Sequence, residues 1–326
     1  MRAVLLGILA SFFFAVTFVL NRKMNLAGGS WIWSASLRYL FMVPFLLAIV
    51  LARRNLGGLL CEMRNRPLRW LGWSFVGFVL FYAPLCFASA YGPAWLIAGT
   101  WQLTIIAGSL LVPFFYTTVD TPDGPRKVRQ QIPIKGLLFS SIILLGIALM
   151  QVQEVDHVSA GILLLSILPV LLAAFAYPLG NRKMMEVCEG RLDAYQRVLG
   201  MTLASLPFWI ILSAYGWITA GRPDEGQVAQ SVIVAISSGV IATVLFFAAT
   251  DSAKGNIHHL AVVEATQAGE VVFSLLGEIW LLSGRLPSGL SLTGMGIVVV
   301  GMILHSLYSH RPAKKKQLSG NRATSL

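Results

Sequence analysis

Long apolar stretches alternate with short polar connections along most of the chain. A helix of about 20 apolar residues is needed to cross a hydrocarbon core about 30 Å thick. The pattern therefore predicts an all-α membrane protein with ten transmembrane helices. The ten segments are residues 3–20, 31–51, 70–90, 94–116, 134–152, 160–180, 194–218, 231–250, 258–283 and 290–308.

The ninth segment is apolar overall but carries regularly spaced polar residues. At about 100° per residue, Glu264, Gln267, Glu270, Ser274 and Glu278 fall within an arc of roughly 120° on a helix. Carboxylates inside a membrane face the bundle interior or a water-filled cavity, and they mark functional sites. Burial disfavours the charged form of a carboxyl group, so a Glu near the midplane could exchange protons. We expect Glu270 and Glu264 to bind substrate and proton, and Glu278 to be a structural anchor.

Composition and charge agree with a membrane protein. The chain of 326 residues is 56% hydrophobic and only 12% charged, which is too little charge to cover a soluble protein of this size. The net charge of +11 comes from Lys and Arg in loops and in the C-terminal tail, so it does not indicate nucleic acid binding. Nineteen of the 25 basic residues, Arg182 and Lys183 among them, are assigned to loops on the side that holds both termini. This bias predicts a multi-pass inner-membrane protein with both termini in the cytoplasm.

The two halves of the chain share short motifs in the same order. Asn-Arg-Lys-Met at 21–24 recurs at 181–184, Ser-Ala-Tyr-Gly at 89–92 is echoed by Ser-Ala-Lys-Gly at 252–255, and Gln102 is echoed by Gln267. Each half has five predicted helices, an odd number, so the second half must be inserted in the opposite direction. The sequence predicts two inverted repeats, residues 1–155 and 156–310, followed by a basic cytoplasmic tail, 311–326, that contacts anionic lipid.

These motifs also resemble those of a known family. The Asn-Arg-Lys elements, the run Phe-Ala-Ser-Ala-Tyr-Gly-Pro-Ala at 87–94 and Gly277-Glu278 resemble the ten-helix branch of the drug/metabolite transporter superfamily. Within it they resemble the putative multidrug resistance efflux transporter family. The resemblance implies export of drugs or metabolites. One departure is that the first half has Pro113 where Glu278 stands in the second.

Other polar and aromatic residues within the spans are candidates to line a cavity. Arg38 could pair with an acid or bind an anionic cargo, or it could extend toward the headgroups. Gln102 and Gln267 could line the cavity or only join helices. Trp101 is the best candidate in an aromatic box for a cation, which could also include Trp95, Tyr82 and Tyr177. Asn21 and Asn181 are expected to be helix caps, and Arg197 an interfacial residue.

The sequence holds no pattern for a cofactor or for ATP hydrolysis. Three scattered cysteines predict no disulfide framework, and the adjacent His258 and His259 do not have metal-ligand spacing. We therefore expect no metal, no cofactor and no enzymatic activity.

Taken together, the residues predict a secondary transporter that exports small, cationic or amphipathic molecules in exchange for protons. Its predicted substrate and proton site comprises Glu270, Glu264, Gln267, Gln102, Trp101 and Arg38. One alternative is an exporter of amino acids or other metabolites, which Arg38 would favour by binding a carboxylate. The other is a membrane scaffold or accessory subunit that transports nothing.

Overall fold

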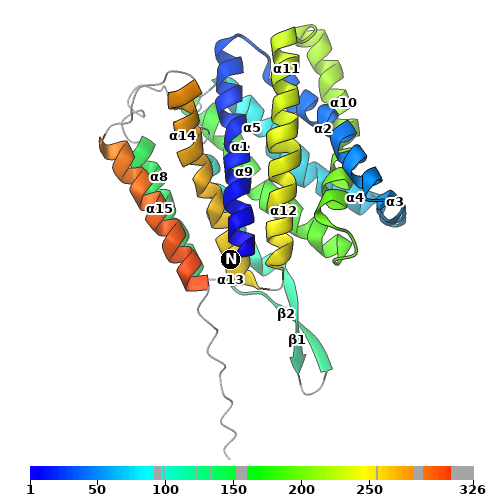
Figure 1. The fold of residues 1–326 in the computed structure, drawn as a ribbon, viewed down its shortest axis with the longest axis vertical. Coiled ribbons are helices and arrows are strands. Elements are labelled where there is room, and N and C mark those ends of the chain that lie inside the picture. The colour runs from blue at the N-terminus through cyan, green and yellow to red at the C-terminus, as the bar shows by residue number, and fades with distance from the viewer. Residues whose placement is uncertain are drawn as a thin grey trace, which may run out of the picture.

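The protein is a bundle of helices with a short β-hairpin at one end (Figure 1). This computed structural model describes residues 1–91, 97, 100–121, 124–132, 134–151, 160–254, 256–281 and 289–309. The hairpin projects below the helices in Figure 1, and α8 and α15 lie side by side along one edge of the bundle.

The first half of the chain contains long apolar helices, one amphipathic helix and the hairpin. A π-helical turn, η1, joins α4 to α5, and a 3-10 turn, η2, follows α7. The elements are α1 (Arg2–Leu26), α2 (Trp31–Ala52), α3 (Leu56–Asn65), α4 (Pro67–Ser74), η1 (Phe75–Val79), α5 (Leu80–Tyr91), α7 (Leu103–Leu110), η2 (Val112–Phe114), β1 (Tyr116–Thr121), β2 (Gly124–Arg129) and α8 (Ile134–Gln151).

The second half contains helices only, within the described residues. A second π-helical stretch, η4, lies between α11 and α12, and a 3-10 turn, η5, separates α13 from α14. The elements are α9 (Ala160–Cys188), α10 (Ala194–Ala220), α11 (Glu225–Val234), η4 (Ala235–Ala242), α12 (Thr243–Ser252), α13 (Ile257–Ala265), η5 (Thr266–Ala268), α14 (Gly269–Leu281) and α15 (Gly289–Ser309).

The helices are those of a membrane protein. Among the described residues, six helical runs are long and apolar enough to cross a bilayer, and shorter apolar helices occur at 137–149 and 292–304. The six runs are Arg2–Met24, Trp31–Ala52, Pro67–Tyr91, Ala194–Ala220, Glu225–Ser252 and His258–Leu281. The count of ten spans and the inverted repeats remain predictions.

Several predicted boundaries were wrong. The first segment was expected to end at residue 20 and the eighth to begin at residue 231, but α1 continues to Leu26 and the eighth helical run begins at Glu225. The fourth segment was expected to be helical to residue 116, but its last turn ends at Phe114 and β1 begins at Tyr116. The sixth was expected to end at residue 180, but α9 continues to Cys188, so Arg182 and Lys183 lie in a helix and not in a loop. The predicted scheme also had no counterpart of α3, whose ten residues are too few to cross a membrane.

Helices α9 and η1 approach so closely that two glycines meet at their crossing. A Cβ atom added to Gly180 would lie 2.2 Å from the Cα of Gly77, and backbone cannot move aside as a flexible side chain can. We expect Gly180→Ala to lower the free energy of unfolding by about 1–3 kcal/mol, because the helices must separate.

The matched control for this substitution is Gly161→Ala in the same helix. A Cβ at Gly161 meets no atom within 4 Å, so this variant should be as stable as the parent or slightly more stable. Thermal unfolding in detergent measures both. Equal midpoints for the two variants would show that the crossing is not tightly packed.

Helices α2 and α10 are joined differently at their two ends. At one end lies a charged seam. Arg53, at the end of α2, contacts Asp193, at the start of α10, at 3.2 Å, and Arg191, just before α10, contacts Glu62 of α3 at 2.7 Å. Arg191 also hydrogen-bonds the exposed Glu189 and so lowers the pKa of that carboxyl group. At the opposite end lies a neutral seam.

The neutral seam consists of amide, indole and backbone contacts. The Trp33 Nε1 donates to the Gly221 carbonyl at 2.9 Å, and the Gln227 side chain donates to the Ser30 carbonyl at 2.6 Å. Both seams connect residues from the first and second halves of the chain.

Candidate functional site

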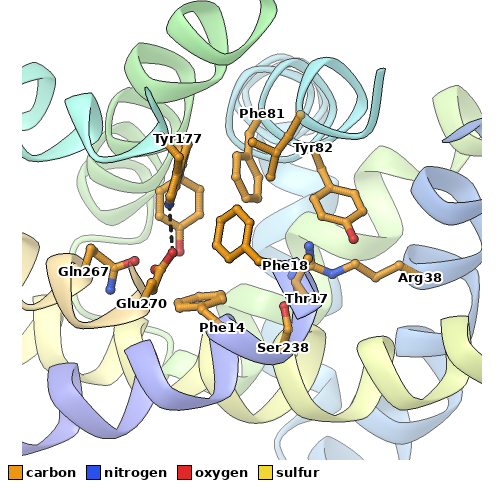
Figure 2. A pocket seen from close by; sticks show the side chains of 12 residues that line it. Phe14, Thr17, Phe18, Arg38, Phe81, Tyr82, Tyr177, Ser238, Gln267 and Glu270 are labelled. Atoms are coloured by element: carbon orange, nitrogen blue, oxygen red, sulfur yellow. Dashed lines mark hydrogen bonds between the residues drawn. The ribbon is translucent and has the colours of Figure 1, made fainter. Parts of the chain in front are cut away.

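A narrow cavity lies between the two halves of the bundle, where α1, α2, α5, α9 and α14 converge (Figure 2). Its volume is about 20 Å³, which is room for about one water molecule. The structure is therefore closed around this site, and a cargo would require the helices to separate. The lining residues are Phe14, Thr17, Phe18, Arg38, Phe81, Tyr82, Leu85, Trp101, Tyr177, Ser238, Gln267 and Glu270.

Glu270 reaches the cavity from the first turn of α14. Its side chain is buried, and Oε2 accepts a hydrogen bond from the Trp101 Nε1 at 3.0 Å. The Trp101 ring is held in place by Phe81 and Tyr177, at centroid distances of 5.0 and 5.7 Å. Glu270 is in no salt bridge with a described residue, so its bonded partner here is a neutral donor.

Arg38 reaches the same cavity from α2. Figure 2 shows its guanidinium group on the opposite side from Glu270, with the rings of Phe18 and Phe81 between them. The group lies over the Tyr82 ring, with the guanidinium carbon 4.0 Å from the ring centroid. Arg38 is 2% exposed, and its Nε has no hydrogen-bond partner among the described residues.

Several other polar groups of the lining have no protein partner. The buried hydroxyl oxygens of Thr17, Tyr177 and Ser238 make no hydrogen bond to a described residue, and neither do the amide atoms of Gln267. Most buried polar groups in proteins are bonded, and leaving one unsatisfied costs about 1–3 kcal/mol. Such a concentration of unused donors and acceptors is typical of a binding site that water or a ligand completes.

Glu264 belongs to a separate ion pair. Arg182 holds its carboxylate with two contacts of 2.6 Å from Nη2 and one of 3.0 Å from Nε. Both side chains are nearly fully buried, at 5% and 6% exposure. Gly108 of α7 packs directly on this pair, since a Cβ there would lie 2.1 Å from the Glu264 Oε2.

Comparison with known proteins gives the family. A family model described as "EmrE: Putative multidrug resistance efflux transporter" matches residues 1–311. The chain belongs to this efflux transporter family. Membership shows a small-molecule transporter of the membrane.

Two relatives are similar to the transporter in sequence, and one solved structure is similar to it in fold. It is 61% identical over 321 residues to "Uncharacterized protein YjlA" of Bacillus subtilis (strain 168), covering 98% of this chain and 99% of that protein. It is 54% identical over 270 residues to an "Uncharacterized 42.1 kDa protein" of Shouchella clausii, covering 83% and 70%. A crystal structure of a protein of 16% identity matches with a TM-score of 0.70 over 96% and 98% of the two chains, which shows a shared fold.

The transporter brings together four of the six predicted site residues. Glu270, Gln267, Trp101 and Arg38 line the cavity, whereas Glu264 is in its ion pair. Gln102 is fully buried but is not among the lining residues. Tyr82 and Tyr177 of the expected aromatic box also line the cavity. Trp95 and the side chain of Glu278 lie outside what the structure describes.

Two expectations about other polar residues of the transporter were wrong. Asn21 and Asn181 are not helix caps, because they lie inside α1 and α9, and Asn181 donates to the Thr250 hydroxyl at 3.4 Å. Arg197, which was expected at the membrane interface, lies near the start of α10 with its side chain packed inside the protein. It is 1% exposed and forms an ion pair with Asp251.

Some lining residues were not predicted from the sequence. Thr17 and the phenylalanines of α1 lie in a helix whose apolar residues surround it on all sides, so no face stood out. Ser238 lies in η4, where the wider π-helical turn breaks the usual periodicity.

A larger hollow of about 330 Å³ lies on the other side of the α13–α14 break, between α1 and α15. Apolar side chains line it, apart from the hydroxyl group of Thr266, so it offers little to orient a polar cargo. We therefore place the candidate site in the smaller, polar cavity.

Proposed function

We propose that the protein exports small amphipathic molecules carrying a cationic group, in exchange for protons. Glu270 is the group at which proton and cargo compete. The observation that carries the proposal is a buried carboxyl group, in the cavity between the two halves, whose bonded partner is an indole and not a cation.

The contrast with Glu264 supports this assignment. Arg182 already neutralises Glu264, so a proton or a cationic cargo would have to displace a buried arginine. Glu270 has no such competitor within salt-bridge distance among the described residues. A carboxyl group in this position is stable when protonated and can instead be neutralised by a cationic cargo.

We propose for the protein the architecture that the sequence predicts. Ten spans form two inverted five-helix repeats in the inner membrane, with both termini in the cytoplasm. Rocking of one repeat against the other exposes Glu270 to each side in turn. The seams between α2 and α10 and the narrowness of the cavity support such a two-sided closure.

Transport by the purified protein in liposomes tests the function. With an acidic lumen and a neutral medium, an exchanger should accumulate an external fluorescent quaternary ammonium cation, which has no uncharged form that crosses lipid, while protons leave the vesicle. The uptake should vanish when a proton ionophore collapses the gradient. Uptake equal to that of protein-free vesicles would instead favour a scaffold or accessory subunit that transports nothing.

A further inference from the structure

Arg38 and Arg197 each lie in the helix that follows an Asn-Arg-Lys-Met motif, 17 residues after Asn21 and 16 residues after Asn181, yet their surroundings differ. Arg197 forms an ion pair through Nη1 with the Asp251 carboxylate, and its Nη2 donates to the Phe247 carbonyl at 3.2 Å. The second arginine therefore has a carboxylate supplied by the protein. This is the usual condition for burying a cation.

The first repeat lacks the corresponding acid. Asp251 immediately precedes the motif at 252–255, and the residue that precedes the matching motif at 89–92 is Ala88. No salt bridge joins Arg38 to a described carboxylate; its Nε is unbonded, and its guanidinium group contacts the neutral side chain of Tyr82. A buried cation without a counter-ion is costly, and the Tyr82 ring offsets only part of that cost.

The cavity is where the missing anion would be bound. Arg38 is one of its lining residues, with unbonded hydroxyl groups of Thr17 and Ser238 lining the same cavity. A guanidinium group presents a planar set of donors that matches the two oxygens of a carboxylate. Figure 2 shows these groups gathered around Arg38, across the aromatic rings from Glu270.

We infer that Arg38 forms a carboxylate subsite, so that the cargo is a zwitterion with an apolar or aromatic body. Its carboxylate binds Arg38, its body lies against Phe18 and Phe81, and its cationic group, at the far end of that body, lies toward Glu270. This inference rests on the proposed function for the role of Glu270, but the carboxylate subsite can be tested by binding alone.

Equilibrium dialysis of the detergent-purified protein tests the subsite with two probes, phenylalanine and phenylalaninamide. They share a ring and an amine, and only the first carries a carboxylate. The parent protein should prefer phenylalanine by about tenfold or more, because a charge-assisted pair is lost with the amide. Arg38→Met should abolish the preference, and Arg38→Lys should retain part of it.

The outcomes separate this inference from the proposed function. Preference for phenylalanine without gradient-driven transport would contradict the proposed exchange of cargo for protons and would still support the carboxylate subsite. Equal binding of the two probes by the parent, binding of neither, or an unchanged preference in Arg38→Met would overturn the subsite.

A stability comparison shows whether Arg38 is merely structural. Arg197→Met leaves Asp251 without its partner and should lower the unfolding temperature by several degrees. Arg38→Met removes a cation that has no counter-ion and should leave the unfolding temperature unchanged or raise it. An equal fall in both variants would mean that Arg38 supports the fold as Arg197 does, which would also overturn the inference.

Discussion

Arg182→Ala is expected to lower the free energy of unfolding by about 3–5 kcal/mol, because it leaves the Glu264 carboxylate buried without its partner. Glu264 cannot turn toward solvent, since Gly108 packs against its oxygens and the side chain is almost fully enclosed. Denaturant titration of the purified protein in mixed micelles measures the change.

The double variant Arg182→Met, Glu264→Gln is the informative control. It removes both charges and keeps most of the buried volume, so it should recover most of the lost stability. Arg64→Ala, on the exposed face of α3, should change stability by less than about 0.5 kcal/mol. If Arg182→Ala were as mild as Arg64→Ala, the buried ion pair would not contribute to the fold.

Glu270→Gln is expected to abolish gradient-driven uptake in liposomes while leaving the fold intact. The Gln side-chain oxygen can still accept the hydrogen bond from Trp101, so packing is retained. The side chain can no longer lose a proton or neutralise a cationic cargo. Uptake should fall to the level of protein-free vesicles, with an unfolding temperature close to that of the parent.

The matched control for this substitution is Glu225→Gln, which removes an exposed carboxylate in the first turn of α11. It should transport as the parent does. Undiminished uptake by Glu270→Gln would show that Glu270 does not carry the exchange, and Glu264 would then be the remaining candidate.

Much of the helical architecture could be predicted because it depends on local properties. Apolar length set the extent of the spans, and helical periodicity placed Gln267 and Glu270 on one inward face. Both are buried at the cavity, as the polar arc of the ninth segment requires.

What could not be predicted depends on contacts between distant residues. Arg182 was assigned to a loop because positive charge is usual there, and its partner Glu264 lies 82 positions further along the chain. The role of Thr17 depends on which side of α1 faces the cavity, and that is decided by its neighbours. The hairpin β1–β2 follows Pro113, where a rule based on apolar length alone extended the helix.

The two seams differ in chemistry, because one consists of ion pairs and the other of hydrogen bonds between neutral groups. Ion pairs between exposed groups weaken as dissolved salt rises, because charges are screened over a Debye length of about 8 Å at physiological ionic strength. Hydrogen bonds among amide, indole and carbonyl groups lack that sensitivity. A rise in salt concentration on the side of the membrane that bathes Arg53 and Glu62 should therefore weaken the contacts at that end of the bundle. The contacts made by Trp33 and Gln227 at the opposite end should not respond to salt in the same way.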